Sequence, residues 1–147
     1  MPNAANELLI LGLLIAANGI LTAAETAVVS ARKVKLRRMA EAGREGAKAA
    51  LAIAEHPGRF LGLVQFWLTI TSVIAGAALV ASASQEFSSW FSRWPAAAPW
   101  AEIIGLVAGT LVVSSAMLFF GELLPKRIAL SNPERAAAIL GPAMRTI

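Results

Sequence analysis

Three stretches of the chain are almost continuously apolar, and each is long enough to cross a lipid bilayer. They cover residues 8–30, 60–83 and 101–124. A helix needs about 20 predominantly apolar residues to span the hydrocarbon core. The alternation typical of a half-buried strand is absent, as are Asn-Gly and Asp-Gly hairpin signals. The pattern predicts an all-α membrane protein with three transmembrane helices.

Each predicted span carries polar side chains along one side. Their helical spacing places them on one face of each span: Asn18, Thr22, Glu25 and Thr26 on the first, Gln65, Thr69, Ser72 and Gly76 on the second, and Thr110, Ser114 and Gly121-Glu122 on the third. Lipid cannot satisfy these oxygens, so we expect the three stripes to face one another. For any single Ser or Thr, the alternative is a hydroxyl bonded to its own helix backbone.

The segment 31–59 between the first two spans is basic and amphipathic. It is rich in good helix formers, and its apolar positions recur at helical spacing. We expect Gly43 to interrupt this helical connector and Pro57-Gly58 to end it before the second span. A basic amphipathic segment is typical of a helix on an anionic lipid surface. The alternative is a solvated basic connector.

The placement of charge predicts an orientation. Segment 31–59 and the C-terminal tail are rich in Lys and Arg, whereas the loop 84–100 contains only Arg93. By the positive-inside rule, the N-terminus and loop 84–100 lie outside, and segment 31–59 and the C-terminus are cytoplasmic. Trp residues in loop 84–100 fit an interfacial aromatic belt. We therefore expect a multi-pass protein of the plasma (inner) membrane.

Composition narrows the classes of function. The chain is 57% hydrophobic and 15% charged, against about 25% charged residues in a soluble domain. It has no Cys and a single histidine, His56, so thiolate or histidine metal sites and a Ser-His-Asp triad are not expected. The prediction is that the chain is not an enzyme. Its net charge of +4 comes mostly from residues that adjoin the spans, which argues against nucleic acid as a partner.

Two glutamates, Glu25 and Glu122, lie within the apolar stretches. A charged side chain at the membrane centre costs roughly 2.5–3.5 kcal/mol on insertion scales, so such a group indicates a functional site. Pro125 denies an amide hydrogen to the Gly121 carbonyl one turn earlier. A carbonyl freed beside the Glu122 carboxylate forms a hard oxygen cluster, which suits Mg²⁺, Ca²⁺ or Na⁺. For Glu25, the alternatives are a structural ion pair with Lys126 or Arg127, or a contact with a helix terminus.

Three segments together resemble a known family. They are Glu25-Thr26-Ala27, the second-span residues from Gln65 to Thr69 with Ala75-Gly76, and Gly121-Glu122-Leu123-Leu124-Pro125-Lys126 followed by Asn132-Pro133-Glu134-Arg135. In this order they resemble the transmembrane domain of the CorC/CNNM magnesium transporters, whose bacterial members are often labelled hemolysin-like. The resemblance covers nearly the whole chain, which we interpret as one transmembrane transport domain over residues 1–147.

The resemblance implies a homodimer that transports Mg²⁺, with export driven by Na⁺. The ligands it implies are Thr22, Thr69, Ser72, Gly121 and Glu122, with Glu25, Gln65, Ser114, Pro125 and Lys126 as supporting residues. The chain departs from the family at Ala23 and Ala24, where relatives usually carry Ser, and at Ser72, where many carry Asn. A further transmembrane helix is expected to begin within residues 133–147. Full-length relatives then continue into regulatory CBS domains, which this sequence does not include.

The leading hypothesis is therefore a Mg²⁺ transport domain that holds the ion between its helices. The rival is a membrane interaction or regulatory module without transport, in which the polar stripes only pack helices together. Coupling to protons through Glu25 or Glu122 is a variant of the first hypothesis. For packing, we predict that Gly76 provides a close helix contact that Gly76→Leu would disrupt.

Overall fold

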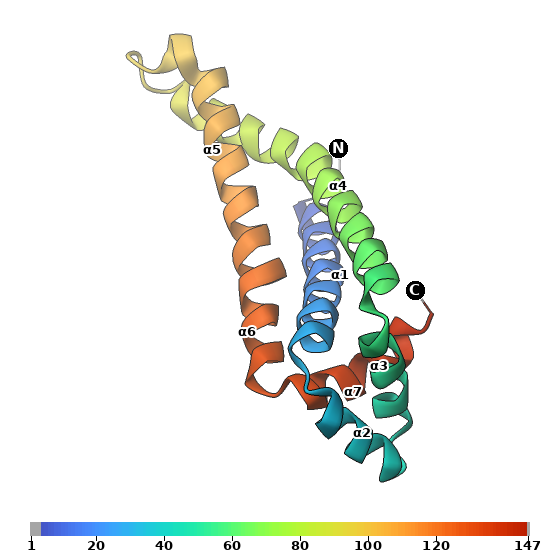
Figure 1. The fold of residues 1–147 in the computed structure, drawn as a ribbon. Helices are drawn as coiled ribbons and strands as arrows, with labels where there is room; N and C mark the ends of the chain where they lie inside the picture. Colours follow the sequence, from blue (N-terminus) through green and yellow to red (C-terminus); the bar gives the residue numbers. More distant parts are fainter. Residues whose placement is uncertain (1–3, 147) are drawn as a thin grey trace.

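The fold is a set of three long helical rods joined by shorter helices. The computed structural model describes residues 4–146, and every regular element within that range is helical. The rods are α1 (Ala4–Ser30), α4 (Pro57–Phe91) and a continuous rod formed by α5 (Ala101–Ala116), η2 (Met117–Leu123) and α6 (Leu124–Ser131), as Figure 1 shows. All three are long and apolar enough to cross a membrane, which confirms the predicted fold class. Residues 1–3 and 147 of the predicted domain 1–147 lie outside the described residues.

The rods differ from the predicted spans mainly at their ends. Helix α4 continues to Phe91, so the loop predicted over 84–100 is wrong in its first half. The chain turns back only after Phe91, through the 3₁₀ helix η1 (Ala98–Trp100). In the extended part of α4, Ser84 and Ser88 lie against Gly105 and Gly109 of α5. The polar residues from 84 onward therefore continue α4 and do not mark its end.

Close contact between two rods is provided by glycines other than Gly76. A Cβ atom built on Gly105 would lie 2.7 Å from the Ser84 carbonyl oxygen, and one on Gly109 would lie 2.7 Å from the Ser84 nitrogen. A Cβ atom on Gly76 would meet nothing within 4 Å. The prediction that Gly76 mediates close packing is therefore wrong within this chain. Gly105 and Gly109 form the small-xxx-small pattern that lets membrane helices approach closely.

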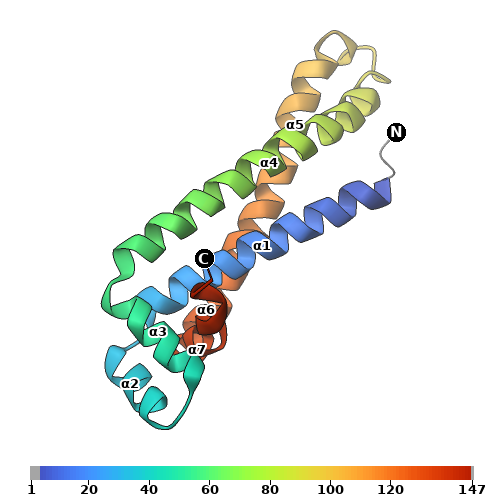
Figure 2. The same cartoon turned by 90° about the vertical axis from the view of Figure 1, so that its right-hand side faces the viewer.

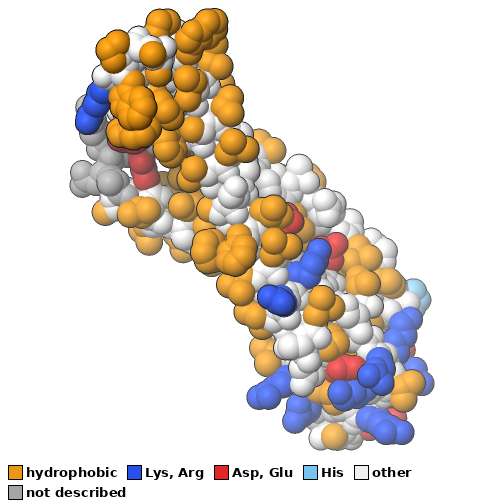
Figure 3. All heavy atoms as spheres, turned by 90° about the vertical axis from the view of Figure 1, so that its left-hand side faces the viewer, with side chains coloured by type: hydrophobic (Ala, Val, Ile, Leu, Met, Phe, Trp, Pro, Cys, Tyr) orange, Lys and Arg blue, Asp and Glu red, His pale blue; other side chains and the backbone are white. Residues whose placement is uncertain are grey.

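Three short helices close one end of the rods (Figures 1 and 2). They are α2 (Lys33–Glu41), α3 (Glu45–Glu55) and α7 (Pro133–Met144). The predicted helical connector is confirmed with its break at Gly43, whose φ of 88° favours glycine. Its predicted end is wrong: α3 stops at Glu55, and Pro57-Gly58 form the first turn of α4, where a proline is well tolerated. Lys and Arg side chains gather at this end of the molecule, whereas apolar side chains cover the rods (Figure 3).

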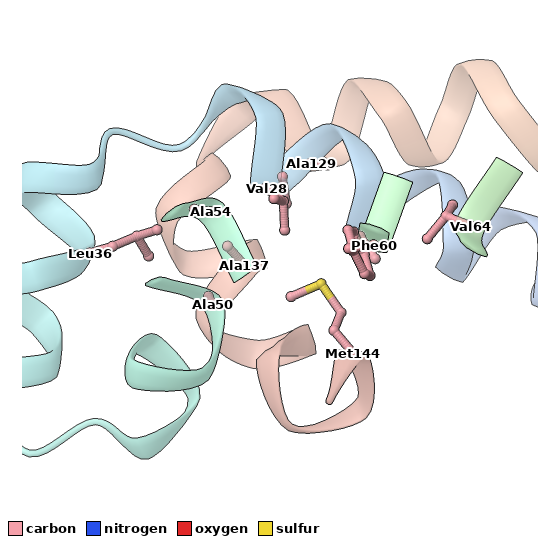
Figure 4. Close-up of a cluster of buried hydrophobic side chains, with 11 residues drawn as sticks. Val28, Leu36, Ala50, Ala54, Phe60, Val64, Ala129, Ala137 and Met144 are labelled. Atoms are coloured by element: carbon pink, nitrogen blue, oxygen red, sulfur yellow. The ribbon is translucent and has the colours of Figure 1, made fainter. Parts of the chain in front are cut away.

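The main hydrophobic core lies where the rods meet the short helices (Figure 4). Leu36 of α2 and Val64 of α4 are both fully buried there. Along the rods, by contrast, large apolar side chains such as Leu111 are exposed, as expected for surfaces that face lipid. The core is built from side chains of α1, α2, α3, α4, α6 and α7: Ala24, Ala27, Val28, Leu36, Ala50, Ala54, Phe60, Val64, Ala129, Ala137 and Met144.

The motif Asn132-Pro133-Glu134-Arg135 begins α7 and attaches it to α2. The Asn132 side chain accepts a hydrogen bond from the Arg135 backbone N–H, as an N-cap residue does. The buried Glu134 carboxylate accepts the backbone N–H of Arg32 at 3.4 Å and the Lys35 ammonium at 3.3 Å. This part of the family-like signature therefore has a structural role in docking α7 at the start of α2.

Glu134 is expected to make folding depend on acid pH. Burial by itself raises the pKa of its carboxyl, but its own backbone N–H, the Lys35 ammonium and the Arg32 N–H together hold that pKa below its ordinary value. A depressed carboxyl pKa stabilises the fold above the unfolded-state pKa, and this stabilisation is lost as the pH falls through the folded-state pKa.

We predict that Glu134→Gln lowers the free energy of unfolding near neutral pH by about 1–3 kcal/mol, and by less below pH 4. The measurement is thermal unfolding in detergent across that pH range. The control is Glu41→Gln, which neutralises an exposed carboxylate on α2. Equal losses for Glu134→Gln at neutral and acid pH would contradict the assigned role.

Candidate functional site

The polar stripes of the three rods meet at one pocket of about 560 Å³. It lies between α1, α4 and the η2–α6 part of the third rod, because its lining residues come from those elements. Seven of the predicted site residues line it: Thr22, Glu25, Gln65, Thr69, Ser72, Glu122 and Lys126. Leu68 and Val73 complete the wall. Part of each predicted stripe therefore lies on one space, whereas Thr110 and Ser114 of the third stripe do not line it.

Thr22 is the most unusual residue of this pocket. Its side chain is buried, with 2% of the residue exposed, and its Oγ1 has no hydrogen-bond partner among residues 4–146. A buried polar group without a partner costs about 1–3 kcal/mol. This hydroxyl consequently has unused hydrogen-bonding capacity in a residue of the pocket wall.

The charges of the pocket are two carboxylates and one ammonium, from Glu25, Glu122 and Lys126. Ion pairs within 4.0 Å among the described residues involve Glu45, Glu55 and Glu134 instead. The alternative that Glu25 forms a structural ion pair with Lys126 or Arg127 is therefore wrong. Glu25 is half-buried and Glu122 is exposed, so the pocket is open on one side. Its lining carries a net charge of −1 and attracts cations.

The second rod contributes neutral oxygens. The Thr69 hydroxyl donates to the Gln65 carbonyl of its own helix at 2.8 Å, which is the local bond considered as the alternative for such residues. Donation leaves the lone pairs of the Thr69 oxygen available to a cation. Ser72 and Gln65 add a hydroxyl and an amide on the same wall.

Beside the pocket, the third rod changes from α- to π-helical geometry. The π-helix η2 covers Met117–Leu123, and the Leu124 N–H donates to the Phe119 carbonyl five residues earlier. Single π turns inside α-helices occur frequently at functional sites. Here the cause is local, because Pro125 has no N–H to offer the Gly121 carbonyl. The predicted helix break thus takes the form of a wider turn rather than an interruption.

Asn18 takes the place of the missing donor. Its Nδ2 donates to the Gly121 carbonyl at 3.4 Å, and its Oδ1 accepts the Thr71 hydroxyl at 2.8 Å. One buried amide thereby links α1 to both other rods one helical turn from Thr22. Asn18 belonged to the predicted stripe but not to the predicted site, and Thr71 to neither. The signal for Asn18 was an amide in mid-span, four residues before Thr22.

Three predicted residues do not line the pocket. Ser114 is exposed on α5, a helix that contributes no residue to the pocket. Gly121 is buried against Asn18, and its carbonyl already accepts the Asn18 amide. Pro125 packs on Gly19, where an added Cβ would lie 2.9 Å from the proline Cγ. Gly121 and Pro125 therefore pack against α1 next to the pocket and do not line it.

Within residues 4–146, no group of three or more His, Cys, Asp or Glu side chains is placed to hold a metal ion. A hard cation in this pocket would therefore depend on neutral oxygens as well as on Glu25 and Glu122. Such a donor set, carboxylate, hydroxyl and amide oxygen, is the kind that Mg²⁺ and Ca²⁺ bind in proteins.

Comparisons with known proteins agree with this architecture. The family described as "Cyclin M transmembrane N-terminal domain" (CNNM) matches residues 8–147. The UPF0053 protein of Synechocystis is 39% identical over 143 residues, which cover 96% of this chain and 32% of that protein. The polyamine export protein of Escherichia coli K12 is 31% identical over 140 residues, covering 95% and 31%. That of Haemophilus influenzae is 31% identical over 129 residues, covering 84% and 28%. The chain spans about a third of the length of these relatives.

Proposed function

Because the chain belongs to the CNNM transmembrane domain family, we propose that its central pocket carries a small hard cation, Mg²⁺, across the membrane. The observation that carries the proposal is the buried Thr22 hydroxyl, which has no partner among the described residues and belongs to a residue that lines the same pocket as two carboxylates. Within residues 4–146 the Thr22 oxygen has no hydrogen-bond partner, and two carboxylates line the same pocket. This combination of a neutral oxygen with negative charge suits a bound cation.

The proposed ligands differ in part from those predicted from the sequence. Glu122 and Glu25 supply negative charge, and Thr22, Thr69 and Ser72 supply neutral oxygens. Gly121 acts through the shape of the π-helix and not as a free carbonyl. Mg²⁺ dehydrates reluctantly and often keeps several waters, and a pocket of about 560 Å³ has room for them.

Coupling to Na⁺ follows if the two cations prefer different packings of the rods. An ion shifts a conformational equilibrium only by its differential affinity for the two states. The open side of the pocket at Glu122 would be covered by a second copy of the chain in the proposed homodimer. Export, with segment 31–59 in the cytoplasm, is the direction proposed.

The test is Mg²⁺ flux in liposomes that contain the purified protein and a trapped Mg²⁺-sensitive dye. Glu122→Gln should reduce flux at least tenfold, because it removes a charge that faces the ion while keeping side-chain size, and one pocket charge is worth several times the roughly 1.4 kcal/mol of a tenfold change. Thr22→Val should reduce it less.

The matched control is Glu102→Gln, an exposed carboxylate in the first turn of α5 and outside the pocket. Normal flux through folded Glu122→Gln protein would reject Glu122 as a ligand. Absence of flux from the unaltered protein would favour the interaction-module hypothesis.

A second cargo, a polyamine, is favoured by the names of the relatives and by the pocket itself. Two carboxylates on different rods could each receive an ammonium group of an organic polycation. The same liposomes loaded with labelled putrescine distinguish the two. Putrescine flux that Mg²⁺ does not inhibit, with no Mg²⁺ flux, would replace the magnesium proposal.

A further inference from the structure

A second pocket, of about 600 Å³, lies at the basic end of the molecule and is lined by positive charge. Its charged residues are Lys35 and Arg38 of α2, Arg44 between α2 and α3, and Arg135 of α7. Asn132, Met39 and Ala42 complete it. None of these residues lines the central pocket, so a ligand of this basic pocket would bind whichever cargo the central pocket carries.

Within the described part of the chain, the arginines of this pocket have no carboxylate partner. Ion pairs within 4.0 Å among residues 4–146 include Lys35, held by Glu134, but not Arg38, Arg44 or Arg135. The Asn132 Oδ1 is occupied by the Arg135 N–H, which leaves the amide NH₂ as a donor. Three arginines that line one pocket, together with an amide donor, supply the kind of groups that bind the oxygens of a phosphate.

The pocket is continuous with the ends of two membrane spans. Lys35 and Asn132 also line an adjoining pocket of about 450 Å³, whose other residues include Ser30 and Leu130. Ser30 is the last residue of the first candidate span, and Leu130 lies one residue before the end of the third. Leu130 and Ile128 expose 52% and 64% of their surface. A ligand with a phosphate in the basic pocket can therefore lay apolar chains along α6.

We infer that this pocket binds the headgroup phosphate of an anionic phospholipid from the leaflet at the basic end. The occupant needs both a phosphate and acyl chains, because the site joins a pocket lined by three arginines to an exposed apolar face at the end of a membrane span. The lipid would hold α2 and α7 together at the base of the rods. The site is more specific than general attraction of segment 31–59 to a charged surface, since Asn132 and Arg135 lie outside that segment.

The test compares two variants that each lose three positive charges at the same end of the protein. The pocket variant is Arg38→Gln/Arg44→Gln/Arg135→Gln. The control is Lys33→Gln/Arg59→Gln/Arg145→Gln, none of which lines the basic pocket. Binding of short-chain phosphatidylglycerol to the whole protein in a non-ionic detergent is measured, with phosphatidylcholine of the same chain length and inorganic phosphate as further arms.

The pocket variant should bind phosphatidylglycerol on the order of 100-fold more weakly, because it loses at least two charge-assisted hydrogen bonds to the phosphate, each worth about a factor of ten. The affinity of the control variant for phosphatidylglycerol should fall by less than tenfold. If both variants lost the same affinity for phosphatidylglycerol, binding would depend on general charge attraction, and the proposed site would be rejected. Inorganic phosphate that displaces the lipid at equal concentration, or equal binding of phosphatidylcholine, would overturn the anionic-lipid assignment. Thermal unfolding verifies that each variant is folded.

Discussion

Replacing Gly105 and Gly109 together by alanine is expected to lower the free energy of unfolding by up to about 4 kcal/mol net, because each change overpacks a close helix contact at a cost of about 1–3 kcal/mol. The added Cβ atoms would lie 2.7 Å from backbone atoms of Ser84. Backbone of a packed helix cannot move aside as a flexible side chain can. The intrinsic preference of helices for alanine over glycine, about 1 kcal/mol per residue, offsets only part of the cost.

The matched control is Gly62→Ala/Gly76→Ala on α4, the partner rod. A Cβ atom on either glycine would meet nothing within 4 Å, so the same two methyl groups should leave stability unchanged or raise it. Unfolding in mixed micelles, followed by helical circular dichroism, measures both. If the two double variants were equally stable, close contact between α4 and α5 would not hold the rods together.

These glycines also show what the sequence did and did not predict. Long apolar runs predicted the three spans, because length and hydropathy alone decide whether a helix can cross a bilayer. Which glycine contacts a neighbouring rod depends on the rotation of each helix about its axis. The polar stripe of α4 suggested Gly76, whereas close packing uses Gly105 and Gly109 of α5.

The candidate site was predictable in its membership but not in its internal bonds. Residues of three stripes were expected to meet, and Thr22, Thr69 and Glu122 do line one pocket. Ser114 shares a broad stripe with Glu122, but the π-helix between them changes the rotation of the rod, and Ser114 does not reach the pocket. A shift from 3.6 residues per turn cannot be read from periodicity, although Pro125 gives the reason for it.

The last prediction concerns Asn18, which supports the site without lining it. Asn18→Leu should lower the free energy of unfolding by about 1–3 kcal/mol, because the buried Gly121 carbonyl loses its side-chain donor and Pro125 cannot replace it. It should also lower Mg²⁺ flux, since Glu122 is the next residue along the π-helix. Thr71→Val removes only the other bond of this amide and is the milder control.

Asn18→Asp separates the two bonds that this side chain makes. An ionised aspartate carboxylate still accepts the Thr71 hydroxyl but cannot donate to the Gly121 carbonyl, whereas a protonated one can donate, so flux is measured over a range of pH. If the bond to Gly121 positions Glu122, Asn18→Asp should lose flux as Asn18→Leu does, whereas Thr71→Val should keep most of it. Flux that falls with Thr71→Val as far as with Asn18→Asp would assign the effect to the contact with α4. In that case the hydrogen bond from the Asn18 amide to the Gly121 carbonyl would not be what positions Glu122.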